Sequence, residues 1–266
     1  MIVTTFVTTT ETAGSVPVSG TALHDHLTDA GSIWLEAARV DVEHHSAAIT
    51  QHYPAVSRRC GRAPLRDGDL LGLRYGTVDD AARGVLLGAL AGPECVDLLD
   101  DLYRHGDAGE KRGVLRGLHR LDGPDDPRGT GIGSTLLTLV EDALRTNDVR
   151  LVAAALQPYG ARYLGVEAYR HAVVKCVFMG VPLHVIANLA ERQDAELVRM
   201  LVDLAHERSA AGRDIPADIP AVVAAFPECL HRADLPADLL NALQPAIPLY
   251  IRSKNSTCAS WTRTFT

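Results

Sequence analysis

A chain of 266 residues, 47% of them hydrophobic, is long enough to bury a sizeable core and too apolar for a disordered protein. Its formal net charge of −7 argues against a nucleic-acid-binding or anionic-membrane-binding protein, because either would be expected to carry a basic stripe. No apolar run reaches the roughly 18 residues of a membrane-spanning helix, so membrane insertion is not predicted.

The first 20 residues lack the basic start and apolar centre of a signal peptide, and their threonines, valines and glycines predict a mobile tail or a short extended arm. The cysteines form no C-x-x-C pair and are odd in number, which favours reduced thiols in a cytoplasmic protein. These are Cys60, Cys95, Cys176, Cys229 and Cys258.

From residue 31 onward, most segments space their apolar residues as helices do. Thr77 is a predicted N-cap followed by two acidic residues, and Gly92-Pro93 is a predicted stop. In chain order, helices are predicted within residues 31–53, 77–92, 93–106, 107–121, 131–147, 148–159, 169–183, 192–213, 219–226 and 236–244.

Eight to ten helices with short joints predict an all-α fold, either a layered bundle or a short irregular α-solenoid. Strand-like alternation occurs only at the two ends of the chain, and no fixed-period repeat is present. We therefore expect one all-helical domain over residues 21–250, followed by a polar tail over residues 251–266.

Three motifs resemble known sites without completing them. The glycine-rich stretch from Gly129 to Thr135 lacks the lysine of a phosphate-binding loop, and a helix entrance is the better interpretation. His206 and Glu207 begin an H-E-x-x-H zinc motif, but Ala210 stands where the second histidine belongs. Asp41 and His45 lie one helical turn apart, yet no third metal ligand is identifiable.

A lysine inside an apolar helix raises a sharper question. The chain has three lysines and 23 arginines, and Lys175 falls in the middle of the segment YRHAVVKCVFMGVPL. Glu167, His171 and Lys175 form one stripe at i, i+4 and i+8. Lys175 could form a core ion pair with Asp203 or Glu207, or it could bind a substrate, and the residues alone leave both open.

The segments ALRTND, QPYGARYLGVEAYRHAVVKCVFMGVPL and LVDLAHERSAAGR together resemble the EboA family of helical metabolite-traffic proteins. The resemblance is strongest over residues 141–213 and extends more weakly to WLEAA, YPAVSRRCGRAPL and TVDDAARGVLLGAL, about two-thirds of the chain. Residues that match family motif positions are Arg145, Thr146, Asn147, Tyr159, Lys175, Phe178, His206, Glu207, Arg208, Gly212 and Arg213.

The chain also departs from that family pattern. Gly160 stands where the family has a second proline, His171 where it has glutamine, and Ser209 where it has tryptophan. If these positions line a cavity, the pocket is remodelled and His171 is the better candidate for acquired chemistry.

With the reduced cysteines, the resemblance predicts a cytoplasmic small-molecule-binding protein of a bacterial specialised-metabolite pathway. Since the chain has no nucleotide motif and no metal set, we expect it to act as a cofactor-independent isomerase or cyclase. His171 would be the general acid or base, oriented by Glu207 or Asp203. The expected ligand-binding residues are Lys175, Arg145, Asn147, Tyr159, Tyr169 and His206.

The alternative is a non-catalytic traffic carrier, or a scaffold that docks onto pathway enzymes. The enzyme and the carrier both predict a metabolite as ligand, whereas a pure scaffold predicts an exposed apolar patch and no enclosed pocket. None of the three requires a metal, a cofactor or nucleic acid. The oligomeric state stays open, a homodimer included.

Overall fold

The computed structural model describes residues 23–122 and 132–244. The two predicted tails and the start of the glycine-rich stretch fall outside these ranges. The fold is all-α, as the spacing of apolar residues predicts, and an isolated antiparallel bridge joins Pro64 to Thr77. Within the described ranges, no helix combines the length and the hydrophobicity needed to cross a bilayer.

The α-helices are α2 (Asp29–His44), α3 (Ile49–His52), α4 (Val56–Cys60), α5 (Val78–Leu87), α6 (Cys95–His105), α7 (Ala108–Gly117), α8 (Leu137–Arg145), α9 (Val149–Ala155), α10 (Pro158–Tyr163), α11 (Val166–Met179), α12 (Leu189–Arg192), α13 (Ala195–Ala210), α14 (Ile219–Val223) and α15 (Ala237–Leu243). Short 3-10 turns connect several of them. The chain divides into two compact units, residues 1–191 and 192–266.

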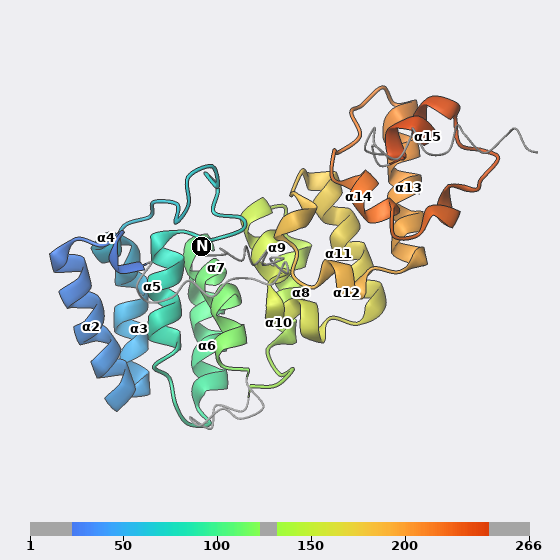
Figure 1. Ribbon diagram of the computed structural model, residues 1–266. Helices are drawn as coiled ribbons and strands as arrows, with labels where there is room; N and C mark the ends of the chain where they lie inside the picture. The colour runs from blue at the N-terminus through green and yellow to red at the C-terminus, as the bar shows by residue number, and fades with distance from the viewer. Residues whose placement is uncertain (1–22, 123–131, 245–266) are drawn as a thin grey trace, which may run out of the picture. The chain divides into compact units, whose positions relative to one another are not determined.

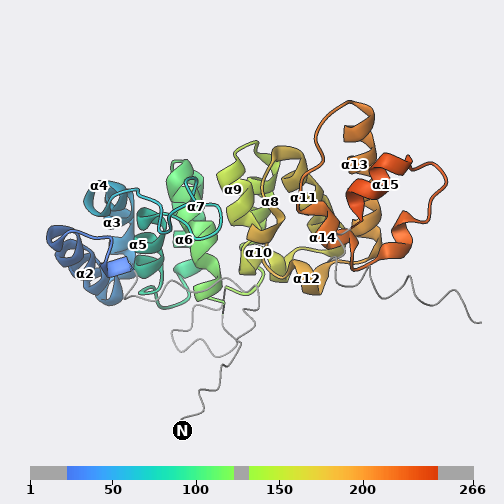
Figure 2. The same cartoon turned by 45° about the horizontal axis from the view of Figure 1, so that its top comes forward.

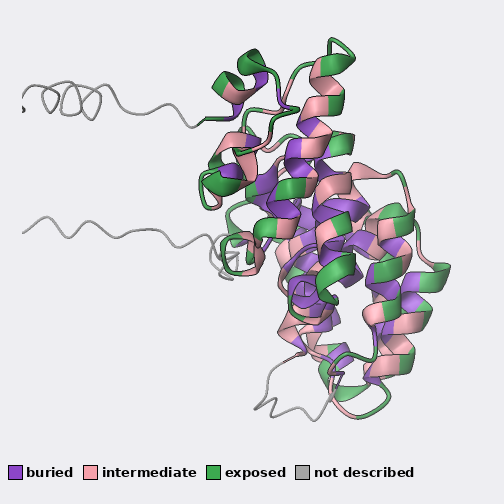
Figure 3. Cartoon of the chain, turned by 90° about the vertical axis from the view of Figure 1, so that its right-hand side faces the viewer, coloured by how far each residue is buried: buried purple, intermediate pink, exposed green. Residues whose placement is uncertain are grey.

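The first unit is built around α5 and α7. Helix α5 packs against α2 and α4 on one side and most extensively against α7 on the other. Helix α7 also contacts α6 and α9, and α9 contacts α8 and α11. Figures 1 and 2 show these helices following one another in neighbouring layers. Figure 3 shows their buried faces turned towards the interior.

The central helices begin where the sequence supplies caps. Thr77 and Asp80 form a capping box at α5, and Asp107 and Glu110 form another at α7. Asp148 caps α9 by accepting hydrogen bonds from the backbone N–H groups of Arg150 and Leu151. The predicted N-cap Thr77 is confirmed.

Helix α7 approaches α5 closely because it lacks side chains on that face. Gly113 and Gly117 lie one turn apart, and both are buried. A Cβ atom on Gly117 would lie 2.3 Å from Leu87 Cδ1, and one on Gly113 would lie 2.5 Å from Arg83 Cδ. The two glycines therefore set the spacing at which the buried charges of α5 meet α7.

Two predicted helices are interrupted. Residues 31–53 do not form one helix, because His45 adopts an extended conformation with φ −141° and a short 3-10 turn follows it. In the segment 192–213, Asp194 is extended and caps α13 through the N–H of Leu197, so the helix ahead of it ends at Arg192. At Asp194 a side-chain cap overrides the apolar period, whereas at His45 the backbone leaves the helix without a side-chain capping bond.

The second unit packs α14, α15 and a 3-10 turn (Pro227–Leu230) against α13. The buried face of α13 consists of Leu197, Val198, Leu201, Val202 and Ala205. Arg232 bridges Asp203 and Asp234 on the surface of this unit.

A candidate anion-binding cavity

Charged side chains lie buried between α5 and α7. Asp79 and Arg83 are 2% and 1% exposed and pair at 2.8 Å. Arg112 Nε, on α7, donates to Asp80 at 2.7 Å, and Arg112 Nη2 donates to the hydroxyl of Thr77 at 2.9 Å. Because a buried charge is tolerated only when it is paired and hydrogen-bonded, these contacts account for the charges in the apolar helix α5.

Hydroxyl groups complete the shell around Asp79. Its carboxylate accepts hydrogen bonds from Thr77 Oγ1 at 2.5 Å and from Ser57 Oγ at 2.9 Å. Burial raises the pKa of Asp79, but these hydroxyls and the guanidinium of Arg83 outweigh it and hold the pKa below its ordinary value. Asp79 is therefore ionised at neutral pH and fixes the position of Arg83.

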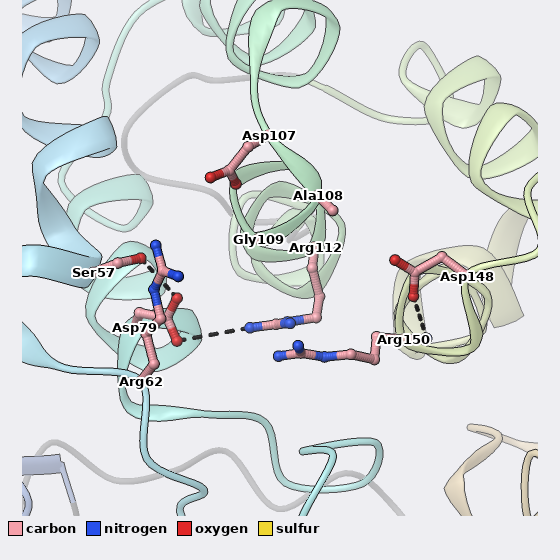
Figure 4. Close-up of a pocket in the computed structure, with 9 residues that line it drawn as sticks. All are labelled: Ser57, Arg62, Asp79, Asp107, Ala108, Gly109, Arg112, Asp148 and Arg150. Carbon is pink, nitrogen blue, oxygen red and sulfur yellow. Dashed lines mark hydrogen bonds and ion pairs between the residues drawn. The ribbon is translucent and has the colours of Figure 1, made fainter.

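A cavity of about 110 Å³ lies beside this network, where the N-terminal turn of α7 faces the start of α9. Since one water occupies about 30 Å³ of liquid, the space accommodates a group the size of a carboxylate or a phosphate. Figure 4 shows the side chains converging on it from α4, α5, α7, α9 and the loop that follows α4. The lining residues are Ser57, Arg62, Asp79, Asp107, Ala108, Gly109, Arg112, Asp148 and Arg150.

The three aspartates of this wall already have donors. Asp79 belongs to the buried network, Asp107 accepts the N–H of Glu110 at 2.8 Å, and Asp148 accepts the N–H of Arg150 at 2.8 Å. Asp107 and Asp148 each make these contacts through Oδ1, and in this way the carboxylates hold the wall in place.

Two of the three arginines have no such partner. Among the described residues, neither Arg62 nor Arg150 has a hydrogen-bond acceptor for its guanidinium, and Arg150 Nε is buried without one. Figure 4 shows the side chain of Arg150 extended alongside that of Arg112. A guanidinium carries five N–H donors, so Arg62 and Arg150 offer the cavity donors that no described acceptor uses. The complementary ligand is an acceptor-rich anion.

The predicted acid/base residue His171 lies on the exposed face of α11. Its Nδ1 is 3.0 Å from the carbonyl oxygen of Glu167 in the same helix. Lys175 is half-buried, and its ammonium donates to the carbonyl oxygens of Leu144 and Thr146, both at 2.7 Å. The predicted stripe of Glu167, His171 and Lys175 therefore exists, and its lysine binds the C-terminal end of α8.

The two predicted ligand-binding tyrosines are 1% exposed. Tyr159 donates its hydroxyl to the carbonyl of Gly133 at 2.7 Å, and Tyr169 donates to the carbonyl of Ala187 at 3.0 Å. Both hydroxyls join segments of the first unit that are distant in sequence.

The predicted residues of the joint between α8 and α9 are at the surface. Arg145 pairs with Asp142 at 3.4 Å, and Asn147 is exposed. Thr146 and Asp148 stabilise the turn between α8 and α9. Thr146 Oγ1 donates to the carbonyl of Ala143, and Asp148 caps α9. This joint places Arg150 in the wall of the cavity.

The remaining predicted residues belong to α13 in the second unit. Asp203 pairs with Arg199 at 2.7 Å and with Arg232. His206 is half-buried and Glu207 is exposed. The proposed assembly of His171 with these two carboxylates stays a prediction, because the two units are described separately.

In the candidate metal pair of Asp41 and His45, Asp41 lies closer to a different histidine, His52. Asp41 Oδ2 lies 2.7 Å from His52 Nε2, and Asp41 Oδ1 lies 3.9 Å from His45 Nδ1. Over the described residues, no group of three or more histidine, cysteine or acidic side chains is arranged to hold a metal ion.

Sequence reasoning missed the arginine cavity. Arg62 and Arg112 are 50 residues apart in sequence, and Arg112 and Arg150 are 38 apart, so no local motif joins them. The available signal was the pair Asp79-Asp80 followed by Arg83 inside the apolar helix TVDDAARGVLLGAL, which indicates buried charges that need partners on another helix.

Comparison with known families gives one match. The sequence model of a family described as "Metabolite traffic protein EboA" matches residues 73–224, more than half of the chain. This range includes every cavity residue except Ser57 and Arg62. Neither the curated proteins nor the solved structures contain a match.

Proposed function

The chain belongs to the EboA family, and from this premise we propose that it is a non-catalytic carrier that holds a small acidic metabolite by its anionic group. The observation that supports the proposal is the cavity in which the guanidiniums of Arg62 and Arg150 have no acceptor among the described residues. A carboxylate or phosphate would accept from both, with Arg112 fixed behind them by Asp80.

The size of the cavity defines how much of the ligand it takes. A volume of about 110 Å³ takes the acid group and a few further atoms, so the remainder of the metabolite would lie over the mouth. This arrangement favours transport over chemistry, since the bulk of the ligand stays accessible to whatever receives it.

The carrier interpretation replaces catalysis as the first choice because of the surroundings of His171. An effective general acid or base is positioned within hydrogen-bond reach of its substrate, in a site that excludes water. The ring of His171 is exposed and one of its nitrogens faces the carbonyl of its own helix. Isomerase or cyclase activity thus stays the second hypothesis, and a cytoplasmic location in a specialised-metabolite pathway belongs to both.

Native mass spectrometry of the purified protein, after mixing with an extract of cells that express the neighbouring pathway genes, tests the proposal. We expect retention of a small acid that is released unchanged. Arg62→Gln and Arg150→Gln should each weaken retention by about 10- to 100-fold, the range expected for loss of a hydrogen bond to a charged group. Arg145→Gln is the matched control, since Arg145 is exposed and does not line the cavity.

The outcomes separate the hypotheses. Equal retention by Arg62→Gln, Arg150→Gln and the parent would remove the cavity from the proposal. Conversion of the retained molecule to an isomer, lost in His171→Gln, would establish catalysis in place of carriage. Absence of any retained acid would favour a scaffold.

A further inference from the structure

The loop between α4 and α5, residues 61–76, is held rigidly although it carries little regular structure. The carboxylate of Asp69 accepts the backbone N–H groups of Leu73, Arg74 and Tyr75 at 2.9, 3.1 and 2.8 Å. From α7, Arg116 donates to the carbonyls of Gly72 and Leu73, both at 2.6 Å. A free connector would not need this many hydrogen bonds, so its conformation is specified.

The rigid part of this loop presents two leucines to solvent. Leu70 is 83% exposed and Leu71 is 51% exposed, whereas Leu65 and Leu73 on either side are buried and anchor the loop. Figure 1 shows the loop as the teal segment that rises beyond the ends of α4 and α5. Consecutive exposed leucines on a pre-ordered loop lose little conformational entropy when they are buried elsewhere.

The loop that carries these leucines also carries exposed arginines. Residues 61–76 contain three arginines and two aspartates, and Arg58 and Arg59 precede them on α4, in a chain whose net charge is −7. Asp69 is committed to the loop backbone, which leaves Asp67 as the exposed acidic residue among Arg58, Arg59, Arg62, Arg66 and Arg74. The guanidinium carbons of Arg66 and Arg74 lie 5.8 and 5.1 Å from the centre of the Tyr75 ring. Exposed arginines of this acidic chain therefore follow one another in sequence, from the end of α4 into this loop.

We propose that the loop of residues 61–76 docks the protein on an anionic lipid bilayer, with Leu70 and Leu71 entering the acyl boundary and the arginines pairing with lipid phosphates. A fluid bilayer accommodates two adjacent exposed leucines without a matching socket. Leucine is uncommon among the anchoring residues of protein interfaces, whereas exposed leucines beside a basic, aromatic rim are typical of interfacial membrane contacts. The acidic remainder of the molecule would keep other faces away from the same surface.

Co-sedimentation with vesicles tests this docking. The full chain should bind vesicles of three parts phosphatidylcholine to one part phosphatidylglycerol and bind pure phosphatidylcholine at least tenfold more weakly. Raising the salt concentration should weaken binding further, since exposed charges are screened. The double variant Leu70→Ser/Leu71→Ser should bind the anionic vesicles at least tenfold more weakly than the parent.

Matched variants distinguish the contribution of Leu70 and Leu71 to vesicle binding from that of other exposed hydrophobic residues and from that of charge. Ile33→Ser removes a residue that is 73% exposed on α2 and should keep parental binding. Arg66→Glu/Arg74→Glu should abolish the preference for anionic lipid. As a second readout, Leu70→Trp should show a blue-shifted emission maximum with anionic vesicles.

Three results would overturn the proposal: no vesicle binding by the parent, equal binding by the double serine variant, or equal binding to neutral and anionic lipid. Self-association that depends on Leu70 and Leu71, measured by light scattering without lipid, would also overturn it by assigning the loop to a second copy of the chain. None of these variants touches Arg150, so the docking test and the metabolite test fail independently.

Discussion

Arg83 has the lowest exposure of any charged residue described in the chain, and its environment is specific. Its guanidinium donates to Asp79, to Ser57 Oγ at 2.9 Å and to the carbonyl of Gly109 at 3.3 Å, and it lies 5.3 Å from the centre of the Tyr53 ring. Removing one partner of a buried pair leaves the other charge uncompensated. The role of Arg83 is therefore to hold the wall behind the cavity.

We expect Arg83→Met to lower the free energy of unfolding by about 3–5 kcal/mol, because Asp79 would lose its buried partner. Urea unfolding followed by circular dichroism measures this. Arg39→Met is the control: its pairs with Glu36 and Glu43 are at the surface, and the expected change is below about 1 kcal/mol. A loss equal to that of the control would show that the buried pair contributes little.

Arg150 should behave in the opposite way. The Nε atoms of Arg83 and Arg150 are both buried without an acceptor, but only Arg83 is paired with a carboxylate, so Arg150→Met removes an unpaired group that costs stability while keeping most of the side-chain volume. We expect an unfolding free energy equal to that of the parent or higher by up to about 1 kcal/mol, together with loss of acid binding. A substantial loss of stability on the urea curve would indicate a structural role for Arg150.

At the scale of elements, the contact between α5 and α7 depends on a glycine. Gly117→Ala would place a methyl group against Leu87 Cδ1, and overpacking of this kind costs about 1–3 kcal/mol. In a Leu87→Ala background the same substitution should be nearly neutral, because the clashing atom is gone. A double-mutant cycle of urea unfolding measures the coupling, and additive effects would contradict the packing argument.

The helices could be predicted from sequence wherever a cap and an apolar period agree, as at Thr77 and at Asp148. Prediction failed at two places where the backbone leaves the helix although the apolar period continues. His45 is extended without a side-chain cap, and the side-chain cap of Asp194 begins α13 later than the period indicates. The all-α class was predictable because the helical spacing of the apolar residues is enough to predict it.

At the scale of the whole molecule, one half-buried histidine links stability to pH. Burial, followed by the nearby Arg120 guanidinium, lowers the pKa of His119. At pH values below about 6.5, the ordinary pKa of a histidine, His119 therefore takes up a proton in the unfolded chain but not in the folded chain. Stability should fall as pH is lowered from about 6.5 towards the folded pKa, by up to about 1.4 kcal/mol per pH unit.

His119→Gln should reduce this fall between pH 7.5 and pH 5.5, measured as the difference in unfolding free energy from urea titrations at the two values. His171→Gln is the control, since its ring is exposed on α11. If His119→Gln and the parent respond equally to pH, another group is responsible.

The candidate site could be predicted only in part, for a reason of scale. The sequence identified Lys175 as a family position and Asp148 as the start of a helix, and both stabilise the structure near α9. Arg62, Arg112 and Arg150 come together only after α4, α7 and α9 have packed, so their convergence is a property of the tertiary structure. The sequence pattern indicated that charges were buried in α5, and the fold supplied their location.

Chemical modification of the Lys175 ammonium can report on opening of the joint between α8 and α9. Because this ammonium donates to two carbonyls at the end of α8, we expect an amine-reactive reagent such as acetic anhydride to modify it faster when that end has opened. The chain has just three lysines, so mass spectrometry can follow each of them separately. The acylation rate of Lys175 then measures how often the joint between α8 and α9 opens, the same joint that carries Arg150 into the cavity.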